Sequence, residues 1–452
     1  MREIRLHDTR SGRLRPLESR DPGRLGLYAC GPTVYDRIHV GNARPFVVFA
    51  LLKRFLEHEG YVVTLVENVT DVNDKIYDAA RAQGRPSDGL AREMTAAYLE
   101  DTDRLGLGRP DAEPLASATI GPIVDLIQAL IDGGHAYAAG GDVFFRVRSD
   151  PEYGSLSHRG LDDLDQGEGI EGAERKEDPL DFALWKGQKE GEDTAWDAPW
   201  GRGRPGWHIE CSAMAEELLG VGFDVHGGGN DLTFPHHENE AAQTRSARGR
   251  ELASIWFHNG MLQFAGEKMA KSVGNVTTLA GALDRWGRDA LIMLFVSAHP
   301  RGPLVFSEAT MAQAEASVRR VREAARRLRA GPSPPELAPL KERFFAALAE
   351  DFNTPAALAV VWDWIREANR RGGGTGDADL REMLAVLALD DLLDAAADDG
   401  APDPEALELL ARRQEARERR DFDAADRLRD ELAERGWQVR DAADGPTLVR
   451  TR

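Results

Sequence analysis

The chain has 452 residues, of which 42% are hydrophobic and 30% are charged, an ordinary balance for a globular protein with a large core. No apolar run approaches the ~18 residues of a membrane span, and the N-terminal run MREIRLHDTRSGRLRP lacks the apolar centre of a secretory signal. The formal net charge of −20 argues mildly against a nucleic-acid partner, because phosphate binding needs basic surface. We therefore expect a cytoplasmic protein without a membrane partner, long enough for roughly three domains.

The first predicted elements form a β-α-β unit. Residues 1–24 are charged and are predicted to be loop-like. Residues 25–75 then have the order strand, loop, helix, strand, with apolar β-rich runs LGLYA at 25–29 and YVVTLVE at 61–67. The helix is the apolar stretch at 43–58. This order predicts the first half of a doubly wound α/β sheet.

The middle of the chain has a different composition. Residues 77–138 are predicted to be helical, whereas residues 139–205 are rich in Gly, Asp, Glu and Trp and hold only short β-like pieces. An insertion between the two halves of a nucleotide-binding fold would have this pattern. The second half then resumes with a strand at 222–225, a loop at His226-Gly-Gly-Gly, a helix from about His236, a strand at 255–257 and a helix at 279–296.

From about residue 306 the chain is predicted to be helical, and its tail to be a charged helix pair followed by residues 437–439 and a Gly445-Pro446 turn. Residues 311–330 carry six arginines against two glutamates, which could bind a nucleic-acid backbone or could simply be a solvated helix face. An acidic stretch at 391–404 predicts a flexible boundary. The expected domains are 1–305 with an inserted segment at about 95–205, a helical domain at 306–400 and a small C-terminal domain at 401–452.

The segment Cys30–Asn42 (CGPTVYDRIHVGN) lies where the first strand leads into the first helix. Ligands of open α/β sheets bind at the carboxyl ends of strands, and phosphate binds the N–H groups of a helix start. Gly41 lets a base or ribose approach closely because it has no Cβ. His39 and Asn42 can both hydrogen-bond phosphate oxygens. On its own, however, such a turn is more often plain packing.

A second motif far downstream changes that assessment. It is Lys268-Met269-Ala270-Lys271-Ser272, which alone would be a lysine-rich surface turn. Together, HVGN and KMAKS resemble the HIGH and KMSKS signatures of class I aminoacyl-tRNA synthetases. Asn42 stands in place of the final His of HIGH, and Ala270 in place of the first Ser of KMSKS. Cys30-Gly31 and the runs PGWHIECSAM and HGGGNDLTFPHHENE narrow the resemblance to the cysteinyl-tRNA synthetases.

The resemblance implies a fold and a reaction. The fold would be a Rossmann-like catalytic domain with an insertion, then a helical domain on the side of the tRNA stem and anticodon, then a C-terminal anticodon-recognition domain. The carboxylate of L-cysteine would attack the α-phosphorus of ATP, and the cysteinyl group would pass to the 3′ end of tRNA(Cys). Mg²⁺ would accompany ATP, which would be bound by His39, Gly41, Asn42, Lys268, Lys271 and Ser272, with His39, Asn42, Lys268 and Lys271 catalytic.

Four side chains have the chemistry of a metal site. His236 and Glu240 are at i and i+4 on one predicted helix face, and Cys30 and Cys211 are the only two cysteines. From spacing alone, a bare helix face and two structural thiols would be the simpler interpretation. The resemblance implies that these four residues bind one Zn²⁺ per chain. A soft metal would distinguish cysteine from serine, which shape cannot do well.

Further residues are expected around the substrate. Trp207 and His226 would form walls for the bound cysteine, and Asp231 would pair with its ammonium group. The other expected contacts are Gly31, Thr33 and Thr70. Three more histidines crowd the region, and we expect either structural roles or hydrogen bonds to metal ligands for His208, His237 and His258.

Two alternatives remain open from the sequence. A ligase that joins cysteine to an amino-sugar inositol in mycothiol synthesis would share the zinc and adenylate sites, but it has no use for the anticodon-module resemblance at 413–440. A non-catalytic RNA-binding paralogue would predict damaged motifs, yet both motifs and all four metal donors are present. Trp437 in the tail could stack on a base. The family resemblance suggests a monomer.

We predict that Lys271→Ala lowers the rate of adenylate formation by at least about a hundredfold, because the lost ammonium would stabilise the departing pyrophosphate. Cysteine-dependent ATP–pyrophosphate exchange measures this rate. An effect under about tenfold would mean that the KMAKS loop is not catalytic.

Overall fold

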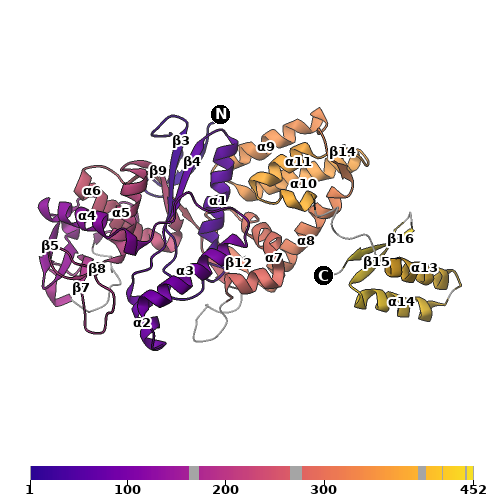
Figure 1. Cartoon of the computed structure of the whole chain (residues 1–452). Helices are drawn as coiled ribbons and strands as arrows, with labels where there is room; N and C mark the ends of the chain where they lie inside the picture. Colours follow the sequence, from indigo (N-terminus) through magenta and orange to yellow (C-terminus); the bar gives the residue numbers. More distant parts are fainter. Residues whose placement is uncertain are drawn as a thin grey trace.

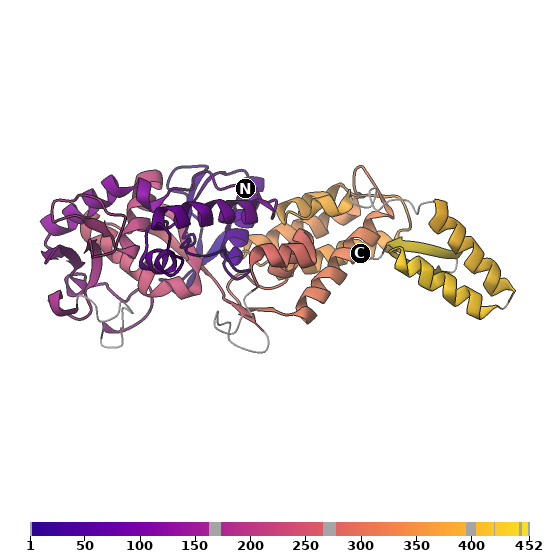
Figure 2. The same cartoon turned by 60° about the horizontal axis from the view of Figure 1, so that its bottom comes forward.

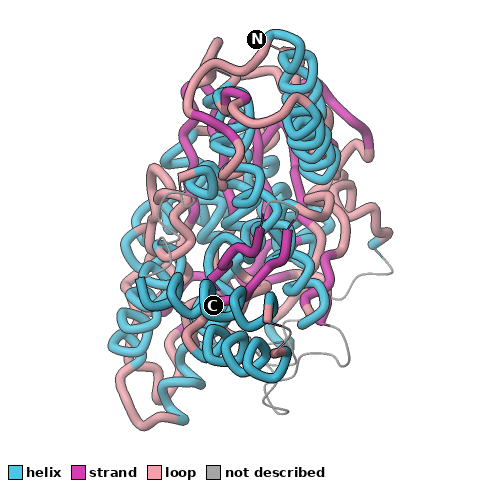
Figure 3. The backbone as a smooth tube through the Cα atoms, turned by 90° about the vertical axis from the view of Figure 1, so that its right-hand side faces the viewer, coloured by secondary structure: helices cyan, strands magenta, loops and turns pink. Residues whose placement is uncertain are grey.

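The computed structural model describes residues 2–161, 173–264, 277–394, 404–419, 421–442 and 445–450. A unit built on a parallel sheet, a helical unit and a small C-terminal unit follow one another along the long axis of the molecule (Figures 1 and 2). Viewed from the C-terminal end, the last unit with its short hairpin lies in front of the other units (Figure 3). Among the helices described, none is long and apolar enough to cross a membrane.

The central sheet has four parallel strands in the order β10-β9-β3-β4. The connection from β3 to β4 runs through α1, and the connection from β9 to β10 runs through α6 in the opposite direction. The predicted doubly wound fold is thus confirmed, with its switch point between β3 and β9. The bounds are β3 (Arg24–Ala29), α1 (Ala43–His58), β4 (Val62–Glu67), β9 (Phe223–Gly229), α6 (Glu238–Arg248) and β10 (Ala253–Asn259).

The glycines after His226 lie in a strand and not in the predicted loop. Residues 226–229 are the carboxyl half of β9 and pair with β10. A Cβ on Gly227 would lie 1.8 Å from the carbonyl oxygen of Phe257. The low strand propensity of glycine therefore misled the prediction, because here glycine allows two backbones to approach closely.

The inserted part contains a second sheet, antiparallel and ordered β5-β6-β7-β8. Its apolar face packs with α4 and α5 around buried side chains such as Ile127, Phe145 and Trp185. The elements of this region are α2 (Asp74–Ala82), α3 (Ser87–Asp103), α4 (Ile120–Asp132), β5 (Ala136–Ala139), β6 (Asp142–Phe145), β7 (Phe182–Gly187), β8 (Gly203–Pro205) and α5 (Trp207–Leu219).

The N-terminal segment is a hairpin, so the loop predicted for residues 1–24 is wrong. Strands β1 (Arg5–Asp8) and β2 (Arg13–Pro16) pair with each other. The buried Asp8 carboxylate accepts hydrogen bonds from the backbone N–H groups of Ser11 and Trp256 at 3.0 Å each. Charged residues can form strands where such partners tie them to the neighbouring β10, a tertiary contact that sequence patterns do not reveal.

The helical unit continues the core of the sheet unit. Apolar side chains of α1 and α7 form one cluster with those of the following helices, including Trp364 and Leu384. The predicted helix at 279–296 coincides with α7 (Leu279–Val296). The other elements are β11 (Leu262–Phe264), β12 (Leu304–Phe306), α8 (Glu308–Ala325), β13 (Leu328–Arg329), α9 (Ala338–Ala349), α10 (Thr354–Arg370), β14 (Thr375–Gly376) and α11 (Ala378–Val386).

The C-terminal unit has a small apolar cluster of its own. It comprises α13 (Pro404–Glu418), α14 (Phe422–Glu434), β15 (Trp437–Ala442) and β16 (Gly445–Arg450). Trp437 is 6% exposed and packs with Ala406, Leu409 and Leu432. The suggestion that Trp437 stacks on a base is therefore wrong, because its ring is part of this core.

Candidate functional site: a cavity and a metal-type cluster

A cavity of about 910 Å³ opens at the carboxyl edge of the central sheet. Segments that follow three of the parallel strands line it, as expected for a ligand site at the switch point of an open sheet. These segments are most of residues 30–42 after β3, the end of β9 at Gly229 with Asp231 and Leu232, and the end of β10 at Asn259 with residues 260–264.

Most of the residues expected to contact ligands line this cavity. They are Gly31, Thr33, His39, Gly41, Asn42, Trp207 and Asp231. Thr70 and His226 do not, because both are buried behind the wall. Thr70 accepts a backbone hydrogen bond from Val34 at 3.1 Å, and it thus supports the wall without forming it. The structure therefore differs from the expectation for these two residues.

The HVGN turn is held by hydrogen bonds between its own ends. The backbone N–H of His39 donates to Asn42 Oδ1 at 3.2 Å, and the N–H of Asn42 donates to His39 Nδ1 at 3.3 Å. A Cβ on Gly41 would lie 2.9 Å from the His39 ring. Gly41 therefore leaves room for that ring. Helix α1 begins directly after the turn, where the positive end of the helix dipole suits phosphate, although Pro45 has no backbone N–H and that of Arg44 donates to the Gly41 carbonyl at 3.3 Å.

The residues of the second motif lie outside the described part of the chain. Lys268, Lys271 and Ser272 fall within residues 265–276, so the structure says nothing about them. The flanking described residues Phe264 and Thr278 both line the cavity.

Beside the cavity, four potential metal donors converge from separate elements. Ligand atoms of Cys30, Cys211, His236 and Glu240 all lie within 4.8 Å of one another, and all four residues are buried. His236 Nε2 lies 2.9 Å from Glu240 Oε1, and Cys30 Sγ lies 3.5 Å from the same oxygen. Cys30 follows β3, Cys211 lies in α5, His236 lies in the helical turn Thr233–His237, and Glu240 lies in α6.

The pKa values of the cluster residues indicate that its negative charge is not fully balanced. Burial and the neighbouring Cys211 raise the pKa of Cys30 well above its usual value. Burial also opposes ionisation of Cys211, but hydrogen bonds from Cys30 and His236 lower the pKa of Cys211 to about 6. Burial opposes the charged form of His236, yet the Glu240 carboxylate raises the pKa of His236 to about 10. One imidazolium thus balances only part of the negative charge.

A divalent cation would supply the missing positive charge. Two thiolates, an imidazole and a carboxylate are donors that metals such as zinc accept, and a bound cation deprotonates a thiol outright. Without a cation, ionising both thiols beside the carboxylate in one small buried volume would cost several kcal/mol per charge, and the raised pKa of Cys30 reflects this cost. The residues therefore fit a metal cofactor.

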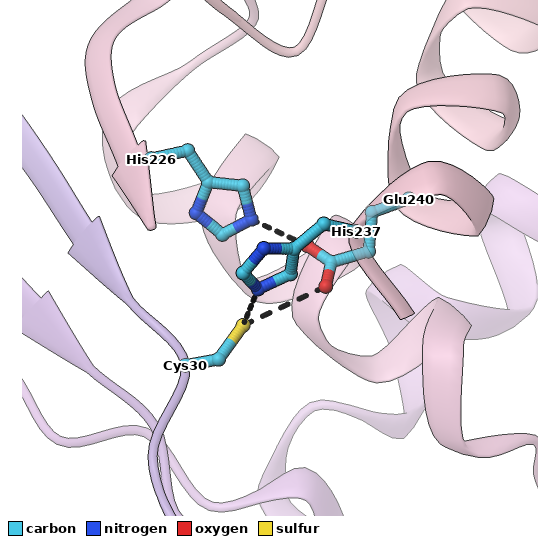
Figure 4. Close-up of side chains that lie close together, drawn as sticks. All are labelled: Cys30, His226, His237 and Glu240. Carbon is cyan, nitrogen blue, oxygen red and sulfur yellow. Dashed lines mark hydrogen bonds and ion pairs between the residues drawn. The ribbon is translucent and has the colours of Figure 1, made fainter. Parts of the chain in front are cut away.

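Other histidines contact the donor residues. The sequence alone indicated that these histidines lie in this region but not which donors they contact. His226 Nε2 lies 2.7 Å from Glu240 Oε2, and His237 Nε2 lies 3.3 Å from Cys30 Sγ (Figure 4). His258 Nε2 lies 2.7 Å from His237 Nδ1 and extends the chain. Such partners orient metal ligands and fix their protonation.

His226 and His237 could also belong to the donor set itself. Together with Cys30 and Glu240 they form a second group within the same 4.8 Å limit. We favour the set with Cys211 and His236, because it contributes a second soft thiolate and leaves His226 and His237 to hydrogen-bond the donors.

Trp207 connects the cluster with the cavity. Its ring stacks on that of His236 with centroids 4.2 Å apart and planes 18° apart. His208 approaches the same imidazole, with the two Nδ1 atoms 2.9 Å apart. Trp207 therefore lines the cavity and restrains a donor of the cluster at the same time.

The sequence analysis missed several polar residues of the cavity wall. Arg37 and Lys75 add two cations, and Glu67 adds a buried carboxyl group. Burial raises the pKa of Glu67 to about 8, although Tyr98 donates a hydrogen bond to its Oε1 at 2.9 Å. Glu67 ends a strand that was predicted, and this position at the carboxyl edge was the only available signal.

Comparisons with known proteins identify the family of this chain. Residues 16–316 match the family of tRNA synthetases class I (C) catalytic domains, residues 343–394 match the DALR domain, and residues 399–447 match the cysteinyl-tRNA ligase anticodon binding domain. A cysteine–tRNA ligase of Symbiobacterium thermophilum is 44% identical over 98% of both chains. The chain belongs to the cysteine–tRNA ligase family. A second member, from Alkalilimnicola ehrlichii, is 45% identical over 99% of this chain and 100% of its own.

Solved structures of other synthetases share the fold of this family member. Methionyl-tRNA synthetase of Mycobacterium tuberculosis, in complex with methionyl-adenylate, superposes with a TM-score of 0.59 at 16% identity. The superposition covers 83% of this chain and 90% of the methionyl-tRNA synthetase chain. The LeuRS of Agrobacterium radiobacter K84, in a ternary complex, superposes with a TM-score of 0.60 at 12% identity, and the superposition covers 85% of each chain. At these identities the likeness concerns the fold alone.

We predict that the purified protein holds about one equivalent of a divalent transition metal and that Cys211→Ser loses most of it, because a soft donor is removed. Elemental analysis after gel filtration measures the content. Retention should also fall as the pH is lowered, because protons then compete for the thiolates. Ser212→Ala, on the same helix, is the matched control, and equal metal in both variants would contradict the donor set.

Proposed function

We propose that the protein is a cysteine–tRNA ligase that activates L-cysteine with ATP and transfers it to the 3′ end of tRNA(Cys). The observation that carries the proposal is the convergence of Cys30, Cys211, His236 and Glu240 beside the cavity at the switch point. Full-length relatives named cysteine–tRNA ligase support the same activity. The metal would be zinc, one ion per chain.

The residues around the cluster would select and orient the amino acid. Bound zinc would take the substrate sulfur as a thiolate ligand, which an alkyl hydroxyl at neutral pH cannot imitate. The Trp207 ring would cover the side chain. The carboxylate of Asp231, which lies over Gly229 because that residue has no Cβ, would pair with the substrate ammonium group. His226 would not form a wall of the cysteine pocket and would instead orient the metal ligand Glu240 by a hydrogen bond.

The other side of the cavity would bind ATP. The start of α1, with His39 and Asn42, would hold phosphate oxygens, and Mg²⁺ would accompany the nucleotide. Lys268 and Lys271 would meet the departing pyrophosphate. The first step needs no general base, because the attacking group is already a carboxylate, so these residues would act by positioning and by stabilising charge.

The remaining units would bind tRNA. We assign residues 1–305 to catalysis, 306–400 to contacts along the tRNA and 401–452 to anticodon recognition. Exposed arginines support the second assignment, namely Arg319, Arg320, Arg327 and Arg329. The anticodon-binding match at 399–447 favours tRNA over an amino sugar as the acceptor.

Two assays on the purified protein test this function. Cysteine-dependent ATP–pyrophosphate exchange should be robust, and serine should not support it. The product of the second step should then be cysteinyl-tRNA(Cys), with no transfer to the amino-sugar inositol. Exchange without tRNA charging would identify the mycothiol-type ligase, and the absence of exchange would favour a non-catalytic paralogue.

Removal of the metal should abolish the selection of cysteine over serine. We expect the ratio of kcat/KM values in the exchange assay to fall to the ~10–200-fold that pocket shape can provide, because the thiolate ligand interaction is lost. Reloading with zinc should restore it. A stripped protein that still preferred cysteine by several thousandfold would overturn the role of the metal.

Trp207→Ala should raise the KM for cysteine by about tenfold, equivalent to about 1.4 kcal/mol, because it removes a cavity wall and the stacking on His236. The KM for ATP should stay the same. Trp207→Phe, which keeps an aromatic ring, is the control and should have a smaller effect. An unchanged cysteine KM in the alanine variant would remove Trp207 from the pocket.

A further inference from the structure

A buried arginine lies directly behind the HVGN turn. Arg44 is the second residue of α1 and is 1% exposed. Its guanidinium group donates hydrogen bonds to five backbone carbonyls of two loops. Nη1 contacts the oxygens of Gly260 at 2.5 Å and Met261 at 3.0 Å, and Nη2 contacts those of His299 at 3.2 Å, Pro300 at 3.2 Å and Gly302 at 2.8 Å.

The first of these loops is a wall of the nucleotide cavity. Residues 259–264 line it, and the Leu262 side chain lies against the HVGN turn, 3.7 Å from where a Cβ on Gly41 would be. This wall rests on the second loop, because the Gly260 N–H donates to the Pro300 carbonyl at 2.8 Å. A Cβ on Gly260 would lie 2.1 Å from the carbonyl oxygen of Gly302, so the two backbones are in close contact. Arg44 thus joins both loops to the first turn of α1.

Arg44 also brings a positive charge to this position. No carboxylate lies within ion-pair distance of its guanidinium among the residues described. Although burial lowers the pKa of Arg44 to about 10, the group remains charged at neutral pH. Carbonyl oxygens accept hydrogen bonds from its Nη1 and Nη2 groups, the buried Nε–H has no hydrogen-bond partner, and these dipoles do not cancel its net charge. That charge adds to the positive end of the α1 dipole, where phosphate is expected.

We propose that Arg44 is a positioning residue for the nucleotide, holding the wall at 259–264 at a fixed distance from the HVGN turn and lending its charge to the triphosphate site. This inference rests on the proposed function, since it takes the cavity to bind ATP. It predicts that Arg44 affects the affinity for ATP and leaves the cysteine side of the cavity unaffected, because the metal-type cluster does not contact it.

The test compares Arg44→Met and Arg44→Lys with Arg54→Met as a matched control. Arg54 lies on the same helix and also donates to carbonyls, those of Leu107 and Ala385, but outside this cavity. Calorimetry of Mg-ATP binding without cysteine gives the Kd, pyrophosphate exchange gives both KM values, and thermal melting reports folding.

Arg44→Met should raise the Kd and KM for ATP by at least about tenfold, because displacements of about 1 Å have large effects on bound geometry. The cysteine KM should change by less than about threefold. Arg44→Lys should be intermediate, since lysine keeps the charge but has three donors and no planar fork. Arg54→Met should leave both KM values within about twofold of the original.

Three results would overturn the inference. One is a folded Arg44→Met variant whose ATP Kd is unchanged, and another is a parallel rise in both KM values, which would indicate general loosening. If Arg44→Met does not fold, an unchanged ATP Kd in Arg44→Lys would exclude the positioning role. Protein that binds Mg-ATP but lacks cysteine-dependent exchange would instead contradict the proposed function, and Arg44 would still be tested through ATP binding.

Discussion

The site depends on the cost of burying several anionic groups in one small volume. Two thiols and a carboxylate meet within 4.8 Å, and His236 alone cannot balance their negative charge once both thiols are ionised. A bound cation would remove this imbalance, and the shell of histidines behind the donors would then hold it in place. Most of the chemistry that we propose for this protein follows from that one electrostatic requirement.

The topology of the sheet explains why the donors can meet. Strands β3 and β9 come from different halves of the fold, yet they lie side by side at the switch point. Cys30 follows the first of these strands, and the helix that carries Glu240 follows the second. Residues 210 positions apart in sequence are thereby brought within 3.5 Å.

The sequence allowed the regular elements to be predicted where periodicity and propensity agree. The helix at 279–296 and the strands of the first β-α-β unit are examples. Prediction failed where tertiary contacts override propensity, as in the glycine-rich end of β9 and the hairpin before residue 24. The meeting of Cys30 with Cys211 was expected only through family resemblance, because no local pattern relates them. The contacts of His237 and Arg44 follow from packing and left no trace in the sequence.

The C-terminal unit has an apolar cluster that is separate from the main core. Changes in its surface therefore need not alter the packing around the cavity. Because the two cores are separate, the C-terminal unit could change in sequence along with the tRNA that it binds, while the site that activates the amino acid stays unchanged.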